Sequence, residues 1–231
     1  MQPETPMMAQ GRTASTIALA QNRVLRNTYL LLALTLIPTI LGAWIGVQMN
    51  FSFFAGSPAI GFILFLAIAV GFFYGIEKTK NSGMGVALLL GFTFFMGLML
   101  SRLIAVILGM KTGTSIVMTA FGGTAAVFFV MASLSSVIKR DLSGMGKWLF
   151  VGALVIMVGA IINVFVGSSV GMLVISTLAI GVFSLFMLYD LKRIIDGGET
   201  NYITATLALY LDVFNVFQSL LMILGITSGD D

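Results

Sequence analysis

Seven apolar stretches, each long enough to cross a bilayer as a helix, occupy most of this 231-residue chain. Hydrophobic residues make up 58% of it, against roughly 45–50% in ordinary soluble domains. A soluble fold of this length could not cover so much apolar surface, so the sequence predicts an all-α integral membrane protein with seven transmembrane helices. The predicted spans are approximately Tyr29–Gln48, Pro58–Ile76, Met84–Leu108, Ser115–Ile138, Trp148–Val166, Val170–Ile194 and Ile203–Ile226.

Composition also narrows the chemistry. Cysteine and histidine are both absent, which excludes disulfides, thiol nucleophiles and cysteine-ligated metals. Histidine is the residue that usually titrates near neutral pH. Because the chain has none, any titration in this range must come from carboxyl groups with shifted pKa values. We find no phosphate-binding glycine loop, metal-ligand cluster or nucleophile triad, so we predict no catalytic residues, no cofactor and no enzyme. The net charge of +3 does not indicate a nucleic-acid partner, because the basic residues are scattered over short loops.

The distribution of basic residues predicts an orientation in the lipid bilayer. Cytoplasmic loops of membrane proteins carry an excess of Lys and Arg. With the N-terminus in the cytoplasm and the C-terminus outside, only Arg102 and Lys111 among the 12 basic residues lie toward the outer side. We accordingly divide the chain into a cytoplasmic tail (1–28) with no rigid pattern of its own, a membrane domain (29–226) and a short C-terminal tail (227–231).

Two aspartates lie inside the last two spans, Asp190 in the sixth and Asp212 in the seventh. A carboxylate in hydrocarbon costs several kcal/mol, so such a residue is a functional candidate. The short connection over 196–201 predicts antiparallel neighbouring helices. At about 1.5 Å per residue, the two aspartates differ in depth by about one turn, which allows their carboxylates to meet.

The predicted cation- or proton-sensing site consists of Asp190, Asp212 and Asn215. Asn215 shares one face of the seventh span with Asp212, a face we expect to point into the bundle. Two carboxylates in a dry place cannot both ionise cheaply, so a shared proton would hold them together. Two negative charges would instead repel and offer oxygen ligands to a cation such as calcium. In the alternative interpretation, Asp190 pairs with Lys192 or Arg193 near the helix end.

The run LYDLKRIIDGGETNYITATLALYLDVFNVFQSLLMILG resembles the C-terminal signature of the Bax inhibitor-1 family (transmembrane Bax inhibitor motif proteins). VLRNTYLLLALTL and FGGTAAVFF also resemble its bacterial YccA branch, so the likeness extends from about Arg23 onward. The resemblance implies a central seventh helix wrapped by the other six, in a multi-pass protein of the bacterial inner membrane. It also implies a pH-sensitive calcium leak at the positions of Asp190 and Asp212.

The chain departs from the family pattern at one point. Leak-type members carry an arginine near the end of the second helix that can bond the aspartate pair, whereas Glu77, Lys78 and Lys80 stand there in this chain. The YccA branch is associated with binding and restraining the membrane AAA protease FtsH through the N-terminal tail. The resemblance therefore implies, as an alternative function, modulation of FtsH through residues 1–28.

A third class is intramembrane aspartyl protease, since two membrane aspartates on neighbouring helices are typical of presenilin-type enzymes. Tyr189-Asp190 matches half of that motif, but the partner motif is Gly-x-Gly-Asp. Here Leu209-Tyr210-Leu211 precedes Asp212 instead. The sequence thus favours the leak and the modulator over the protease.

Overall fold

The computed structural model describes residues 6–53 and 56–229, and the predicted tails fall partly outside these ranges. The described residues form seven helices that are long and apolar enough to cross a membrane. These helices are α1 (Pro6–Gln48), α2 (Pro58–Thr79), α3 (Gly83–Leu108), α4 (Gly113–Val137), α5 (Met145–Val166), α6 (Ser169–Ile195) and α7 (Tyr202–Ser228). The predicted all-α fold with seven spans is confirmed.

The helix boundaries follow local turn chemistry, and for α2 to α7 they lie within three residues of the predicted spans. Between α5 and α6, for example, Gly167 adopts a left-handed conformation (φ +67°), which ends α5. The next residue, Ser168, accepts a hydrogen bond from the backbone N–H of Gly171 at 3.0 Å and so caps the start of α6. The apolar runs therefore predict the helices, and glycine and serine set where they begin and end.

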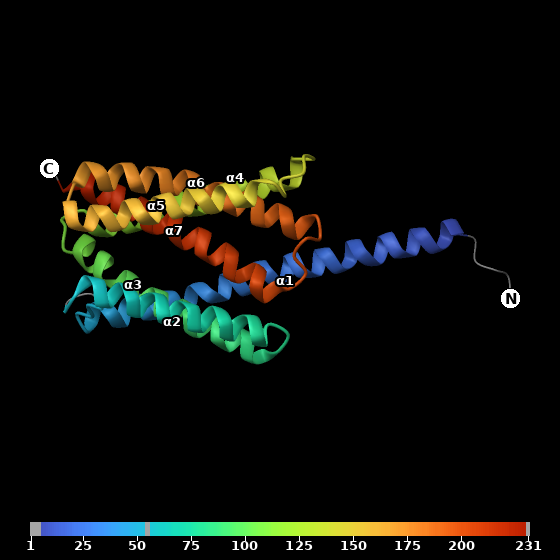
Figure 1. Cartoon of the computed structure of the whole chain (residues 1–231), viewed down its shortest axis with the longest axis horizontal. Coiled ribbons are helices and arrows are strands. Elements are labelled where there is room, and N and C mark those ends of the chain that lie inside the picture. Colours follow the sequence, from blue (N-terminus) through green and yellow to red (C-terminus); the bar gives the residue numbers. More distant parts are fainter. Residues whose placement is uncertain (1–5, 54–55, 230–231) are drawn as a thin grey trace.

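Helix α1 differs from its prediction. It begins at Pro6 and continues without interruption into the first span, so the expectation of no rigid pattern is wrong over residues 6–28. The physical reason is composition, because most residues between Thr13 and Thr28 favour helices and none is Gly or Pro. Figure 1 shows the first half of α1 projecting well beyond the rest of the bundle.

The seven helices form two groups of three, with α7 crossing between them (Figure 1). Helices α1, α2 and α3 pack together on one side, and α4, α5 and α6 on the other. Helix α7 contacts both groups, and its Leu209, Val216 and Leu221 are fully buried. Within the described residues, α5 packs against α6 rather than α7, so it is the outermost helix of its group. The predicted central position of α7 is confirmed.

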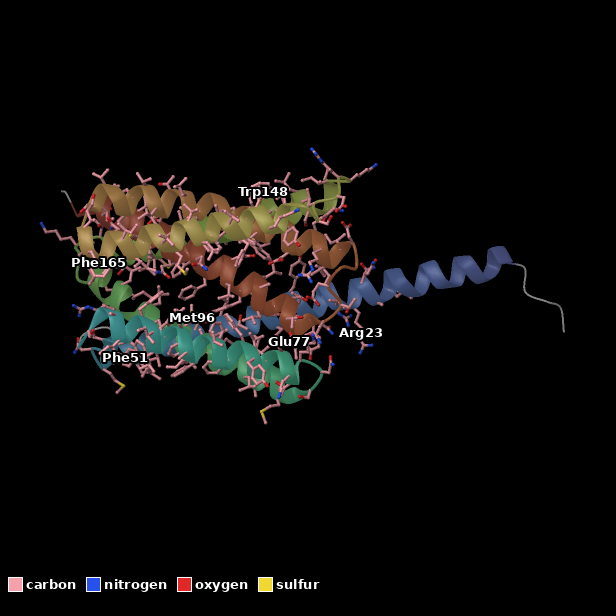
Figure 2. The ribbon with its side chains drawn as sticks, in the orientation of Figure 1. Arg23, Phe51, Glu77, Met96, Trp148 and Phe165 are labelled. Carbon is pink, nitrogen blue, oxygen red and sulfur yellow. The ribbon has the colours of Figure 1, made fainter. Side chains whose placement is uncertain are left out.

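The two ends of the bundle carry different side chains. We call the end from which α1 projects the N-terminal face; the loops α2–α3, α4–α5 and α6–α7 lie there. Figure 2 shows Arg23 and Glu77 toward this face, and Phe51 and Phe165 at the opposite end. Large apolar side chains such as Phe165 (83% exposed) and Trp148 (73% exposed) point outward, as expected for a surface that faces lipid.

Candidate functional site

The site lies between α6 and α7, which run antiparallel and share an extensive contact. The loop that connects α6 to α7 turns at Gly197, whose φ of +78° is a conformation that glycine adopts without strain. This hairpin brings Asp190 and Asp212 together, and their carboxyl groups make a side-chain hydrogen bond. Asp212 is buried (4% exposed) and Asp190 is half-buried. The structure therefore joins the two acids that the sequence singled out.

The contact between the two carboxyl groups needs a proton. An ionised carboxylate only accepts hydrogen bonds, so two carboxyl groups can bond to each other only when one is protonated. Among the described residues, the Oδ2 atom of Asp212 is the one buried side-chain N or O atom without a hydrogen-bond partner. A buried acceptor without a partner is costly, and it is available to a proton or a cation. The arrangement can therefore bind a proton in one state and attract a cation in another.

Asn215, the third predicted residue, lies one turn farther along α7. Its side-chain amide donates to the carbonyl of Leu211 at 2.7 Å, one turn earlier in the same helix. The side-chain amide of Asn215 thus bonds to the backbone of its own helix rather than to the aspartate pair. A role for Asn215 in sensing stays a prediction.

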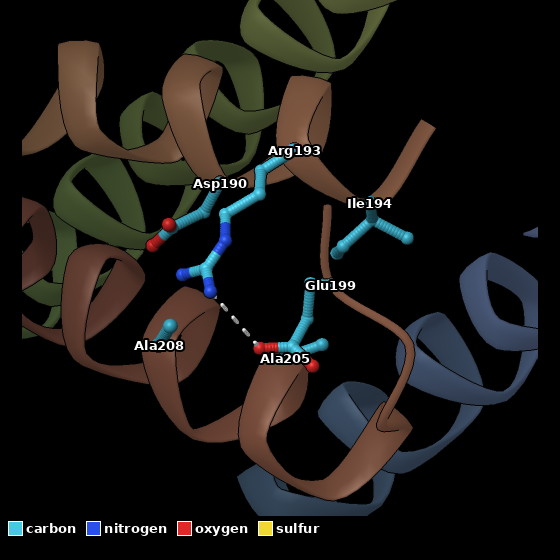
Figure 3. Close-up of a pocket in the computed structure, with 6 residues that line it drawn as sticks. All are labelled: Asp190, Arg193, Ile194, Glu199, Ala205 and Ala208. Carbon is cyan, nitrogen blue, oxygen red and sulfur yellow. Dashed lines mark ion pairs between the residues drawn. The ribbon is translucent and has the colours of Figure 1, made fainter. Parts of the chain in front are cut away.

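The cations near the end of α6 have acidic partners of their own. Lys192 donates to Asp196 at 2.6 Å, and a guanidinium nitrogen of Arg193 lies 3.8 Å from Glu199. Figure 3 shows the Arg193 side chain extending toward Glu199 beside Asp190. The positive charge of Arg193 attracts the Asp190 carboxylate, but its ion pair is with Glu199. In the part of the chain that the structure describes, Asp190 therefore forms no ion pair with Lys192 or Arg193, and the alternative interpretation holds only as a longer-range attraction between Asp190 and Arg193.

The end of α2 does not supply the arginine of the family pattern. Glu77 pairs with Lys80 on the surface of α2, and the ammonium of Lys78 lies 4.7 Å from the ring centre of Tyr74. These side chains engage one another, and in the described residues α2 packs on α3 and, slightly, on α7 rather than on α6. The cation that acts on the aspartate pair comes from α6 instead.

Sequence reasoning missed two features of the site. The first is the ion pair between Arg193 and Glu199, because the sequence indicated Arg193 only as an alternative partner of Asp190. The second is a set of hydrogen bonds that joins α7 to α1 and α3 through the Tyr210 hydroxyl. Its only sequence signal was a tyrosine in the middle of an apolar span.

Several acidic residues of the N-terminal face lie in loops outside the spans, and Asp141 is one of them. Asp141, in the α4–α5 loop, accepts hydrogen bonds from the backbone N–H and the hydroxyl of Ser143, at 2.8 and 3.0 Å. These bonds favour the charged form and lower the pKa of Asp141 below its ordinary value. Asp141 therefore stays ionised at neutral pH.

Comparison with known proteins agrees with this architecture. The family model described as "Inhibitor of apoptosis-promoting Bax1" matches residues 21–229. This range includes both aspartates and all seven helices except the start of α1. The chain belongs to the Bax inhibitor-1 family. The earlier resemblance, drawn from the C-terminal run and two shorter segments, is thereby confirmed.

Relatives within the Bax inhibitor-1 family cover nearly the whole chain. An uncharacterized protein of Neisseria meningitidis is 38% identical, with 95% of this chain and 96% of the relative covered. An uncharacterized membrane protein of Vibrio cholerae is also 38% identical, covering 98% and 99%. The "Modulator of FtsH protease YccA" of Escherichia coli is 37% identical, covering 93% and 95%. The likeness to YccA is thus shown, whereas the absence of enzymatic activity stays a prediction.

Proposed function

We propose that this Bax inhibitor-1 family member is a pH-sensitive cation leak of the bacterial inner membrane, with Asp190 and Asp212 as its gate and calcium as the candidate ion. The observation that carries the proposal is the direct contact of two membrane-embedded carboxyl groups from different helices. The basic bias of the loops supports a cytoplasmic N-terminal face. The gate then lies in the cytoplasmic half of the membrane.

The ligands available support passage of a cation rather than its storage. Calcium prefers six to eight oxygen ligands. Among the described residues there is no group of three or more Asp, Glu, His or Cys side chains that could hold a metal ion. Two carboxylates with carbonyls or water would bind a cation weakly. Conduction requires binding that is weak enough for the ion to leave.

The expected pH dependence follows from the charges that surround the pair. Arg193 and Glu199 act on Asp190, and Asp190 itself is the charge that acts on Asp212. When a proton is shared, the carboxyl groups stay in contact and the path is closed. When the proton leaves, two adjacent negative charges repel each other, and α6 and α7 separate locally. The flux should therefore rise as the cytoplasmic pH rises.

Calcium flux into proteoliposomes between pH 6 and 8 tests the leak. Asp212→Asn should abolish the rise in flux with pH, because an amide hydrogen-bonds like the protonated acid and cannot ionise. Asp196→Asn, at the end of α6, is the matched control and should leave the rise intact. A flux that Asp212→Asn leaves unchanged at every pH would overturn the proposal.

A second candidate function is modulation of the membrane protease FtsH. The name of the Escherichia coli relative supports it, as does the projection of α1 beyond the bundle, which would present this helix to a membrane-bound partner. Residues 1–28 are the proposed contact. This role needs no ion path and can therefore be tested separately.

Recovery of FtsH with the full chain and with a chain lacking residues 1–22 tests the second function. The truncation should lower recovery, while Asp212→Asn in the full chain should not. Equal recovery with and without residues 1–22 would contradict a role for the tail.

A further inference from the structure

Two cavities lie at the N-terminal face, and Arg193 lines both of them. The larger has a volume of about 220 Å³, lies between the α4–α5 loop and the end of α6, and is lined by Asp141, Lys192 and Asp196 among others. We call it the vestibule. One water takes about 30 Å³ in the liquid, so the vestibule has room for several waters or a hydrated ion.

The smaller cavity lies beside the aspartate pair. Its volume is about 10 Å³, and its walls include Asp190, Glu199 and Ala208 (Figure 3). That is room for at most one water. Arg193 lines both cavities and is the one residue that they share. The two cavities therefore meet the same side chain, that of Arg193.

The α6–α7 loop holds Arg193 in that position. Glu199 uses one carboxylate oxygen to accept from the backbone N–H of Asn201 at 2.9 Å and turns the other toward Arg193. The Nε of Arg193 also donates to the carbonyl of Gly198 at 3.4 Å. Lys192, the neighbouring cation, is tied to Asp196 and does not take this place.

We propose that Arg193 and Glu199 form a cytoplasmic gate that closes the vestibule off from Asp190, on the path of a hydrated cation. This inference rests on the proposed leak and its orientation. In the closed state the guanidinium lies between the two cavities, and its charge repels an approaching cation. Arg193 is about half exposed, and ion pairs of this kind are weak and easily exchanged. Release from Glu199 lets the side chain swing into the vestibule and joins the two cavities.

Cysteine accessibility tests the gate directly, since the chain has no cysteine of its own. Ala208→Cys places a thiol beyond Arg193, and Ser143→Cys places one in the vestibule. Inside-out membrane vesicles are treated with a membrane-impermeant, positively charged thiol reagent. In the parent, the Ser143→Cys thiol should react much faster than the Ala208→Cys thiol.

Breaking the Arg193–Glu199 ion pair should change the labelling rate of the Ala208→Cys thiol only. Glu199→Gln should raise the labelling rate of the Ala208→Cys thiol about fivefold, as expected for loss of an exposed ion pair, and leave that of the Ser143→Cys thiol unchanged. Exchanging the charges with Arg193→Glu and Glu199→Arg together should return the rate toward the parent. If Glu199→Gln fails to fold, Arg193→Gln takes its place with the same expected result.

The outcomes separate this inference from the proposed leak. Labelling needs no ion flux, so a rate increase in Glu199→Gln supports the gate even where calcium flux is absent. An unchanged Ala208→Cys rate would overturn the gate and leave the aspartate pair untouched. Equal labelling of both thiols in the parent would overturn it as well.

Discussion

The hydroxyl of Tyr210 in α7 lies 2.9 Å from the hydroxyl of Thr39 in α1, although 171 positions separate them in the sequence. Both hydroxyls also lie within hydrogen-bonding distance of the carbonyl of Thr93 in α3, at 3.4 and 3.2 Å. Tyr210 is 1% exposed. One buried phenol therefore ties α7 to the α1–α3 group, while Asp212, two residues later, bonds to α6 in the other group.

Tyr210→Phe removes this tie and keeps the shape of the ring. We expect the protein to lose about 0.5–1.5 kcal/mol of stability, the usual range for a hydrogen bond between membrane helices. Thermal unfolding in detergent measures it. Tyr202→Phe, at the start of α7 and outside this network, is the control; an equal loss there would refute a specific role for Tyr210.

Asn201 joins the α6–α7 loop to the α2–α3 loop. Its side-chain oxygen accepts from the backbone N–H of Ile203 at 2.9 Å and caps α7, and its amide nitrogen donates to the carbonyl of Lys80 at 2.9 Å. Asn201→Ala removes both and should cost about 1–2 kcal/mol. Asn201→Asp keeps the cap but loses the donor, so it should cost less. Thermal unfolding of both variants measures the two losses. A lower unfolding temperature for Asn201→Asp than for Asn201→Ala would contradict this account.

Sequence reasoning found the spans and the aspartate pair because each has a local signal. Long apolar runs mark the helices, and a charge inside such a run is conspicuous. The Arg193–Glu199 pair and the Tyr210–Thr39 bond have no such signal, because the first depends on how the α6–α7 loop turns and the second on which helices become neighbours. Helix α1 was misjudged over residues 6–28 because hydropathy marks where a span begins and says nothing of a polar helix that precedes it.

Helices α1 and α3 approach so closely that only glycine fits at Gly97. A Cβ there would overlap the carbonyl oxygen of Thr39 and lie 2.9 Å from its carbonyl carbon, backbone atoms that no rotamer change can move. Gly97→Ala should cost about 1–3 kcal/mol or more. Gly122→Ala, on α4 with open space around its Cβ, should be neutral or stabilise by roughly 0.5–1 kcal/mol. Equal unfolding temperatures for the two variants would show that this contact is looser than described.

The hydrogen bond between Asp190 and Asp212 should make stability depend on pH even where no ion flows. In contact, the two carboxyl groups of the folded protein share a proton, whereas unfolded aspartates, which titrate near 3.9, hold almost none at pH 6–8. Unfolding thus releases a proton, and the stability of the parent should fall as the pH rises from 6 to 8, by at most about 1.4 kcal/mol per pH unit.

Asp212→Asn removes the ionisable partner, so its unfolding temperature should stay nearly constant over this range. Asp141→Asn is the matched control. The bonds from Ser143 lower the pKa of Asp141, so this residue is ionised from pH 6 to 8, and its contribution is lost only as the pH falls into the acid range. Its removal should leave the slope of the parent intact. Parallel slopes for the parent and Asp212→Asn, measured by thermal unfolding in one detergent, would show that the two carboxyl groups share no proton.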